Sequence, residues 1–488
     1  MNFLKIMPLA RSIALIATVT GASASQMAMA SEDALLERLM ERGVLTQQDV
    51  DELRTEAQAS RVATQQPTRD DGLQYEPQEG LQQDDVNVQV RRFGVETTDG
   101  SDRFRIRGRL MLDAAHLDNN LDTTDDHRVG EGNLADTGTI IRRARLGALG
   151  LFHDNWEWQL EVDFRDEEVR FANAYIAYLM ETGRLAFGHF KEPFSLESST
   201  SSRRISFLER ATPIDAYRPS RNLGVMYETL QPDWYAALGL FGGDGVGRNR
   251  EVSEGYAISG RASIAPINED NAFVHLGVSG NYRKNARDED DGEYQDVRMR
   301  SRLGTRAIDG RIIGRRDMEA VSDFTTTNLE FAAGHGPFSV QAEYIRQDLN
   351  RDANDPNFSP GEVDSMTMDG WYAQAGVFLT GESRNYRAFS GDFGRVTPHR
   401  PFNPSQGHWG AFELLGRYAT ADHTDHHAPR GRQQVDHWTL GLNWYLQPEI
   451  IAKFNVMYID AEAGDESLDD GVKEWDSWVL GARLQYEF

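Results

Sequence analysis

The sequence predicts an all-β fold, a sixteen-stranded antiparallel transmembrane β-barrel with inward-folded loops, preceded by a short helical segment. Three observations carry this prediction. The chain ends at Phe488 on a strand in which every second residue is apolar, so one face is oily and the other is wet. The same alternation recurs along most of the chain after about residue 100. The alternating segments are joined by short and long connections in turn, as in barrels of the bacterial outer membrane.

Residues 1–30 have the features of a secretory signal peptide. Lys5 and Arg11 give a basic start, residues 13–19 are apolar, and the small residues Ala28 and Ala30 precede a cleavage site. No later run reaches about eighteen apolar residues, so the sequence predicts no membrane-spanning helix. With no cysteine, the exported chain has no disulfide framework. We expect a protein of the cell outer membrane of a Gram-negative bacterium.

Two segments precede the predicted barrel, which covers residues 101–488. In residues 31–60, leucines recur at helical spacing around Gly43, and Thr46 caps a second short helix. This pattern predicts a short helical or coiled-coil segment, for which a trimerising role is one reading. Residues 61–100 are rich in Gln, Asp, Thr and Pro, which indicates a linker.

The alternation predicts sixteen barrel strands. Their expected ranges are 103–115, 140–152, 155–165, 171–180, 183–190, 223–231, 234–241, 255–265, 272–283, 324–335, 337–348, 367–380, 408–420, 435–446, 450–461 and 475–488. One connection, residues 381–407, is long although it falls on the short-turn side. An even strand count places both ends of the barrel in the periplasm, and a barrel of this size encloses an aqueous channel.

Arginine dominates the basic residues of an acidic chain. The formal net charge is −26, yet only five of the 51 basic residues are lysines. Acidic residues gather in stretches such as 116–139, which favours solvated loops or, alternatively, loops bridged by divalent cations to lipopolysaccharide. Guanidinium groups are planar donors suited to carboxylate and phosphate, so the arginines are the candidate functional residues.

The first two predicted strands carry arginines on one face. The members of this set are Arg103, Arg105, Arg107 and Arg109 on the first strand and Arg143 and Arg145 on the second. An arginine that faces lipid near the bilayer midplane costs roughly 2–4 kcal/mol, so the pattern predicts that all of them face the lumen. Such a ladder offers successive weak anion sites. The alternative is pairing with acids on the third strand, Glu157, Glu161 and Asp163.

A second basic cluster lies in the longest predicted loop, 284–323. Arg298, Arg300 and Arg302 would share a face if this segment is extended. We expect the loop to fold inward, which would place these arginines in the pore. An outward loop would leave them solvated.

Several segments of the predicted barrel form a specific set. They are GHFKEPFSLE at 188–197, TSS at 200–202 with Glu209 and Arg210, LTGESRNY at 379–386, GAFE at 410–413, LNWY at 442–445 and RLQYEF at 483–488. Together they resemble the phosphate-selective porin O and P family. The resemblance implies a homotrimer of sixteen-stranded porins for passive diffusion of small solutes. It also implies that the loop after the fifth strand folds into the pore.

The resemblance further implies which residues form the anion path. The positions that match the family's pore arginines are Arg109, Arg142, Arg143, Arg210, Arg300 and Arg302. Lysines of the phosphate-selective members fall at Ser198, Glu157 and Ala186 in this chain, so one position has the opposite charge. We therefore expect a channel that prefers small anions, phosphate or other oxyanions among them, without strong phosphate affinity. A general or carboxylate-type porin is the alternative.

Other motifs are weak. Residues 422–427 contain acids and histidines, and residues 242–247 are rich in glycine, but both fall in predicted loops without the context of a metal or phosphate site. We expect no cofactor, no metal, no catalytic residue and no nucleic-acid partner. The expected partners are further copies of the chain, the lipid bilayer, lipopolysaccharide and small anionic solutes. A barrel enzyme and a surface adhesion protein are the remaining, weaker alternatives.

Overall fold

The computed structural model describes most of the predicted barrel. The described residues are 82–83, 86–89, 93–98, 100–119, 136–165, 169–243, 252–288, 291–308, 310–313, 318–358, 364–424, 433–464 and 472–488. The predicted signal peptide, the predicted helical segment at 31–60 and residues 425–427 of the histidine-containing loop lie outside the described residues. Among the described residues, no helix has the length and apolarity needed to cross a membrane.

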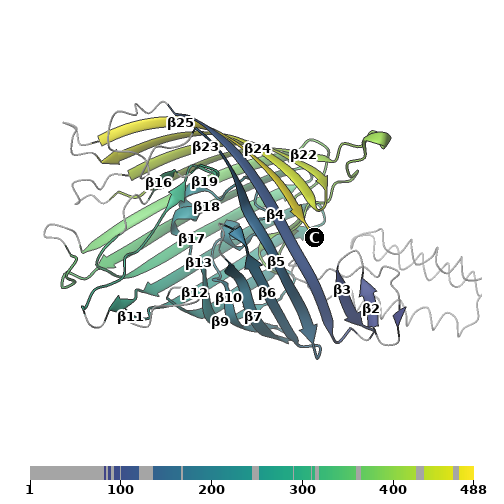
Figure 1. Cartoon of the computed structure of the whole chain (residues 1–488), viewed down its shortest axis with the longest axis horizontal. Helices are drawn as coiled ribbons and strands as arrows, with labels where there is room; N and C mark the ends of the chain where they lie inside the picture. Colours follow the sequence, from purple (N-terminus) through teal and green to yellow (C-terminus); the bar gives the residue numbers. More distant parts are fainter. Residues whose placement is uncertain are drawn as a thin grey trace, which may run out of the picture. The chain divides into compact units, whose positions relative to one another are not determined.

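Sixteen long strands form a closed antiparallel barrel (Figure 1). They are β4 Arg103–Asn119, β5 Thr137–Phe152, β6 Trp156–Asp163, β7 Arg170–Met180, β8 Gly183–Lys191, β9 Arg221–Thr229, β10 Trp234–Gly242, β12 Tyr256–Glu269, β13 Ala272–Lys284, β17 Val321–His335, β18 Phe338–Arg351, β19 Ser365–Phe378, β22 Ala411–Asp422, β23 Gln433–Gln447, β24 Ile450–Gly464 and β25 Val472–Glu487. Each strand pairs with the next, and β25 pairs back onto β4 with Glu487 opposite Arg109. The predicted fold and strand count are confirmed.

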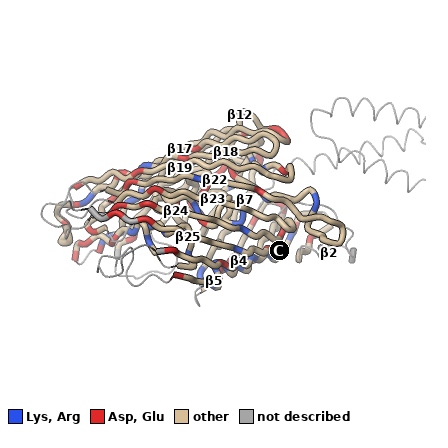
Figure 2. Tube along the Cα trace, turned by 90° about the horizontal axis from the view of Figure 1, so that it is seen from above, with Lys and Arg blue, Asp and Glu red and all other residues tan. Residues whose placement is uncertain are grey.

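The two faces of each strand follow the alternation in the sequence. On β4, Phe104, Ile106 and Leu110 are exposed on the outer surface, whereas Arg107 and Arg109 are buried on the inner face. This is the facing that the lipid penalty for arginine predicts. Acidic residues gather at the ends of β22 to β25 that lie away from the C-terminus (Figure 2).

The segment before the barrel contains strands that the composition did not predict. Within the predicted linker, β1 (Gln82–Gln83), β2 (Val86–Gln89) and β3 (Gly94–Thr97) pair in succession, and β3 pairs with the start of β4. The end of this segment is therefore part of the sheet rather than a free linker. The segment escaped prediction because its strands are only two to four residues long, too short to show a clear alternation.

The loop after the fifth barrel strand, residues 192–220, lies inside the barrel. It carries the short helices α4 (Leu196–Ser199) and α5 (Thr212–Tyr217), whose residues are largely buried. Its backbone reaches the opposite wall, where the Leu208 amide donates to Asn455 Oδ1 (2.9 Å) and the Leu208 carbonyl accepts from Arg483 Nη1 (2.7 Å). The inward fold implied by the family resemblance is confirmed.

Two further segments enter the barrel. The long loop 285–320 includes β14 (Arg287–Asp288), β15 (Ser301–Arg302) and β16 (Arg311–Ile313), and its apolar residues pack with those of β24 and β25 in one buried cluster. The connection 379–410 carries β20 (Tyr386–Arg387), β21 (Asp392–Phe393) and the 3-10 helix η4 (Pro404–Gln406). From it, the Gly391 carbonyl accepts from Arg261 Nη2 on β12 (2.6 Å). The inward fold predicted for the long loop is confirmed.

Candidate anion pathway

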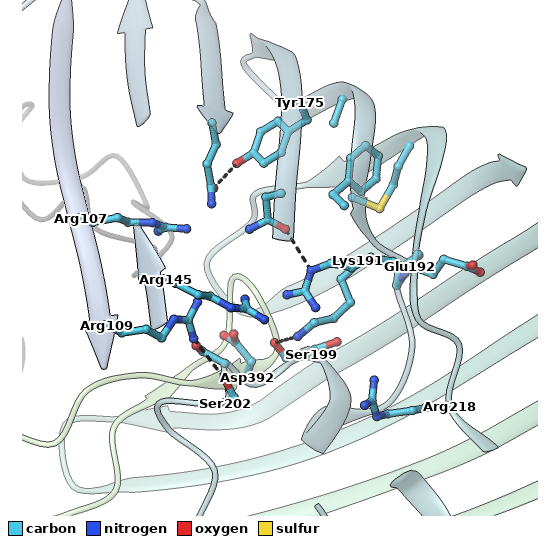
Figure 3. A pocket seen from close by; sticks show the side chains of 18 of the residues that line it. Arg107, Arg109, Arg145, Tyr175, Lys191, Glu192, Ser199, Ser202, Arg218 and Asp392 are labelled. Carbon is cyan, nitrogen blue, oxygen red and sulfur yellow. Dashed lines mark hydrogen bonds between the residues drawn. The ribbon is translucent and has the colours of Figure 1, made fainter. Parts of the chain in front are cut away.

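A cavity lies inside the barrel between the inner faces of β4 to β10 and the inward loop 192–220 (Figure 3). Its charged lining residues are Arg107, Arg109, Arg143, Arg145, Arg184, Lys191, Glu192, Arg210, Arg218, Arg221 and Asp392. Cations thus outnumber carboxylates in the lining. The remaining polar lining consists of serines of the loop, Gln159 and Asn173, with the rings of Tyr175 and Tyr235.

The arginines of β4 and β5 share carboxylates on β6. Glu161 accepts from Arg107 Nη2 (3.0 Å), Arg109 Nη2 (2.8 Å) and Arg145 Nη1 (2.9 Å). Asp163 pairs with Arg145 (2.8 Å) and lies 3.6 Å from Arg143. The register places these groups together, because Arg109 is opposite Arg145 and Arg145 is opposite Asp163. Three guanidinium groups on one carboxylate leave this wall positive.

Arg210 adds a cation from the inward loop. Its guanidinium donates to the carbonyls of Glu197 (3.0 Å), Ser198 (3.4 Å) and Thr200 (3.0 Å), which lie in and just after α4. Among the described residues it forms no ion pair. Burial lowers the pKa of Arg210 to about 10, so the group remains a cation at neutral pH. The carbonyls fix its position, and its charge remains available to a solute.

Residues 104–488 match the sequence profile of the family described as phosphate-selective porin O and P. The chain belongs to this family. It is therefore a porin of the outer membrane of a Gram-negative bacterium.

Relatives with curated sequences extend along most of the porin. Porin O of Pseudomonas aeruginosa is 29% identical over 445 residues, which cover 83% of this chain and 93% of the relative. An uncharacterised protein of Caulobacter vibrioides is 29% identical over 401 residues, covering 80% of this chain and 75% of that protein.

Solved structures also resemble the porin. OmpT of Vibrio cholerae aligns with a TM-score of 0.47 and 13% identity over 80% of this chain and 98% of that one. An anion-selective porin from Comamonas acidovorans aligns with a TM-score of 0.46 and 12% identity over 79% and 100% of the two chains.

The porin brings together five of the arginines singled out in the sequence. Arg107, Arg109, Arg143, Arg145 and Arg210 all line the cavity. Their distribution over two strands and one loop explains why strict alternation along a single strand identified only part of the set.

Arg142 does not line the cavity. The β4–β5 register shifts after Met111, so that Arg143 is opposite Met111 and Ile141 is opposite Leu112, which leaves Arg142 as the extra residue of a bulge. Its Nε and Nη2 donate to the two carboxylate oxygens of Glu209 (2.5 and 2.9 Å). Burial by itself raises the pKa of Glu209, but the Arg142 guanidinium outweighs it and holds that pKa well below its usual range. Arg142 is thus neutralised at this position.

The other predicted arginines lie away from the cavity. Arg103 pairs with Glu96 of β3 (2.8 Å), and half-buried Arg105 is absent from the cavity lining. Arg298, Arg300 and Arg302 alternate with the buried residues Val297, Met299, Ser301 and Leu303, so they share a face as predicted. That face does not contribute to this cavity.

Sequence reasoning missed four lining cations: Arg184, Lys191, Arg218 and Arg221. Arg184 pairs with Glu157 and Glu228, and Lys191 Nζ donates to the carbonyls of Ser198 and Ser199. The alternation along β8 could have identified Arg184, because it lies two residues from Ala186 and therefore on the same inner face. Arg218 and Arg221 carried no such signal, because they flank the start of β9 where the loop leaves the barrel interior.

Proposed function

We propose that this porin is a homotrimeric channel for passive diffusion of small anions, with a broad anion preference and weak affinity for phosphate. The observation that carries the proposal is the charge of the cavity lining, in which eight arginines and Lys191 face two carboxylates, Glu192 and Asp392. A pore lined by cations lowers the energy of a passing anion and raises that of a cation.

The two lining carboxylates are themselves neutralised from outside the cavity. Glu192 pairs with Arg283 and accepts from the side-chain amides of Asn222 (2.6 Å) and Asn281 (2.8 Å). Asp392 accepts from Arg387 Nε (3.1 Å) and Nη2 (2.7 Å). Neither Arg283 nor Arg387 lines the cavity, so these two carboxylates do not neutralise the lining cations. Five lining arginines share four other carboxylates, Glu157, Glu161, Asp163 and Glu228, so the lining keeps an excess of positive charge.

The broad preference rests on the positions where a strong phosphate site would need further charge. Glu157 is negative and paired with Arg184, Ala186 is apolar, and Ser198 is neutral. The family match and the relative Porin O support a porin. In this proposal, phosphate is one of several oxyanions that pass through the channel. The trimer is supported by family membership.

Ion selectivity of point variants tests the anion pathway. Arg210→Gln and Arg221→Gln each remove a lining cation that forms no ion pair among the described residues. We expect each to lower the chloride-to-potassium permeability ratio about twofold or more. The matched control is Arg346→Gln, because Arg346 lies on the outer face in a half-exposed pair with Asp348 (2.8 Å). Equal ratios in all three variants and the wild type would contradict the pathway.

A further inference from the structure

The wall of the cavity across from the arginines of β4 and β5 carries an apolar patch, which lies beside Arg184 and Arg221. Ala186 and Phe190 of β8, Met226 of β9 and Tyr235 of β10 line it. These residues belong to one buried cluster on the inner face of β7 to β12. Figure 3 shows Tyr175, which packs against this cluster, on the far side of the cavity from Arg109 and Arg145.

The aromatic residues of this wall present ring surface. The Tyr175 and Phe190 rings meet edge to face at 5.9 Å between centroids. The Tyr175 hydroxyl donates to Glu157 (2.8 Å), and the Tyr235 hydroxyl donates to Glu228 (2.6 Å). Since these protons point to carboxylates of the barrel wall, Ala186, Phe190, Met226 and the tyrosine rings give a solute apolar contact.

The two walls favour different parts of a solute. The arginines attract an anionic group, and the planar guanidinium can donate two hydrogen bonds to the oxygens of a carboxylate or a phosphate ester. The apolar wall gives nothing to a fully hydrated inorganic anion, but contact with an apolar group removes both surfaces from water. A solute that carries both parts satisfies both walls at once.

We infer that this cavity selects amphiphilic organic anions, which carry a carboxylate or phosphate group at one end and an apolar or aromatic group at the other. The anionic group lies against the arginines of β4, β5 and the inward loop, and the apolar group lies against Phe190, Met226 and Tyr235. This inference rests on the proposed anion channel and names the class of solute that the channel prefers.

Matched pairs of anions test the inference in planar bilayers that contain the purified porin. Block of the chloride current is measured with acetate against benzoate, and with inorganic phosphate against phenyl phosphate. Each pair shares its charged group and differs in the apolar part. Burial of about 50 Å² of apolar surface corresponds to roughly a tenfold gain in affinity, so benzoate and phenyl phosphate are expected to block at about tenfold lower concentration. Equal block within both pairs would overturn the inference.

Two variants assign the effect to the two walls. Met226→Gln keeps the side-chain length but makes the wall polar, and it is expected to abolish most of the difference within each pair while the chloride-to-potassium ratio is unchanged. Arg221→Gln is expected to weaken block by both members of a pair to the same extent. A difference that survives in Met226→Gln would contradict the assigned wall. Heat-modifiable migration shows that each variant is folded, and the wild-type pairs decide the inference even if a variant fails to fold.

The outcome separates this inference from the proposed function. An anion-selective wild type with equal block within both pairs refutes the organic-anion preference alone. A cation-selective wild type refutes the proposed function and the inference together.

Discussion

Arg109 and Arg145 lie opposite each other on β4 and β5 and donate to the same carboxylate oxygen, Oε1 of Glu161, at 2.8 and 2.9 Å. Arg107 donates to the other oxygen of that carboxylate at 3.0 Å. One acid therefore holds three guanidinium groups at the cavity wall. The structure thus combines the two alternatives that the sequence left open, since the arginines are paired with lumenal acids and the wall still carries excess positive charge.

Removal of the shared carboxylate will separate its structural role from its electrostatic one. In Glu161→Gln, three buried guanidinium groups lose their common partner, and breaking a buried ion pair typically costs about 3–5 kcal/mol. We expect a lower unfolding temperature and a higher chloride-to-potassium permeability ratio, because the wall gains positive charge. Differential scanning calorimetry and the zero-current potential measure the two effects. A less anion-selective channel would contradict the proposed role of these arginines.

The facing of β4 can be mapped with single cysteines because the native chain has none. A water-soluble thiol reagent is expected to label Arg107→Cys and Arg109→Cys and to reduce conductance. In membranes, Ile106→Cys and Leu110→Cys are expected to stay unlabelled, since their native side chains are exposed on the outer surface of the barrel. Labelling of Ile106→Cys and Leu110→Cys, with protection of Arg107→Cys and Arg109→Cys, would show that the two faces of β4 are assigned the wrong way round.

The last residue closes the barrel. The Phe488 amide donates to the Gly108 carbonyl (3.1 Å) and the Gly108 amide donates to the Phe488 carbonyl (3.0 Å). The ring fills the space above Gly108, where an added Cβ would lie 2.3 Å from the ring. We expect deletion of Phe488 to reduce the yield of heat-modifiable, membrane-inserted protein severalfold. Deletion of the exposed loop residue Ala353 is the control, and equal yields would show that β25 closes without this pairing.

Phosphate affinity depends on charges that this chain lacks. We predict that millimolar phosphate blocks the chloride current little in the wild type, and more strongly in Ser198→Lys combined with Glu157→Lys. Charges at about 0.15 M salt are screened over about 8 Å, so only groups that contact the ion can hold it. Lysines at these two positions would add charge directly beside the lining, because Glu157 contacts Arg184 of the cavity wall and the Ser198 carbonyl contacts Lys191. Strong phosphate block in the wild type would show that the existing arginines suffice.

The barrel could be predicted from the sequence because lipid imposes a period of two on every strand. All sixteen predicted strands occur, with ends that differ by a few residues, and the arginine face of β4 follows from the same rule. The short strand β3 escaped prediction because its four residues, with Val95 as the only large apolar side chain, are too few to show an alternation.

The site was less predictable because it is assembled across the barrel interior. Arg210 reaches the cavity through the fold of an inward loop, and Arg184 reaches it through the position of β8 in the sheet. Local periodicity can place Arg184 on the inner face of β8 but cannot show that β8 borders the cavity, and it does not place Arg210 at all. The bulge that turns Arg142 toward Glu209 also breaks the alternation, so a strict period of two cannot assign both Arg142 and Arg143.

The most direct test of the central claim is the zero-current potential of single channels in a tenfold gradient of potassium chloride. The excess of cations over carboxylates in the cavity lining predicts a potential displaced toward the chloride equilibrium value. A potential displaced toward the potassium equilibrium value would show that acids dominate the conducting path, and it would contradict the account.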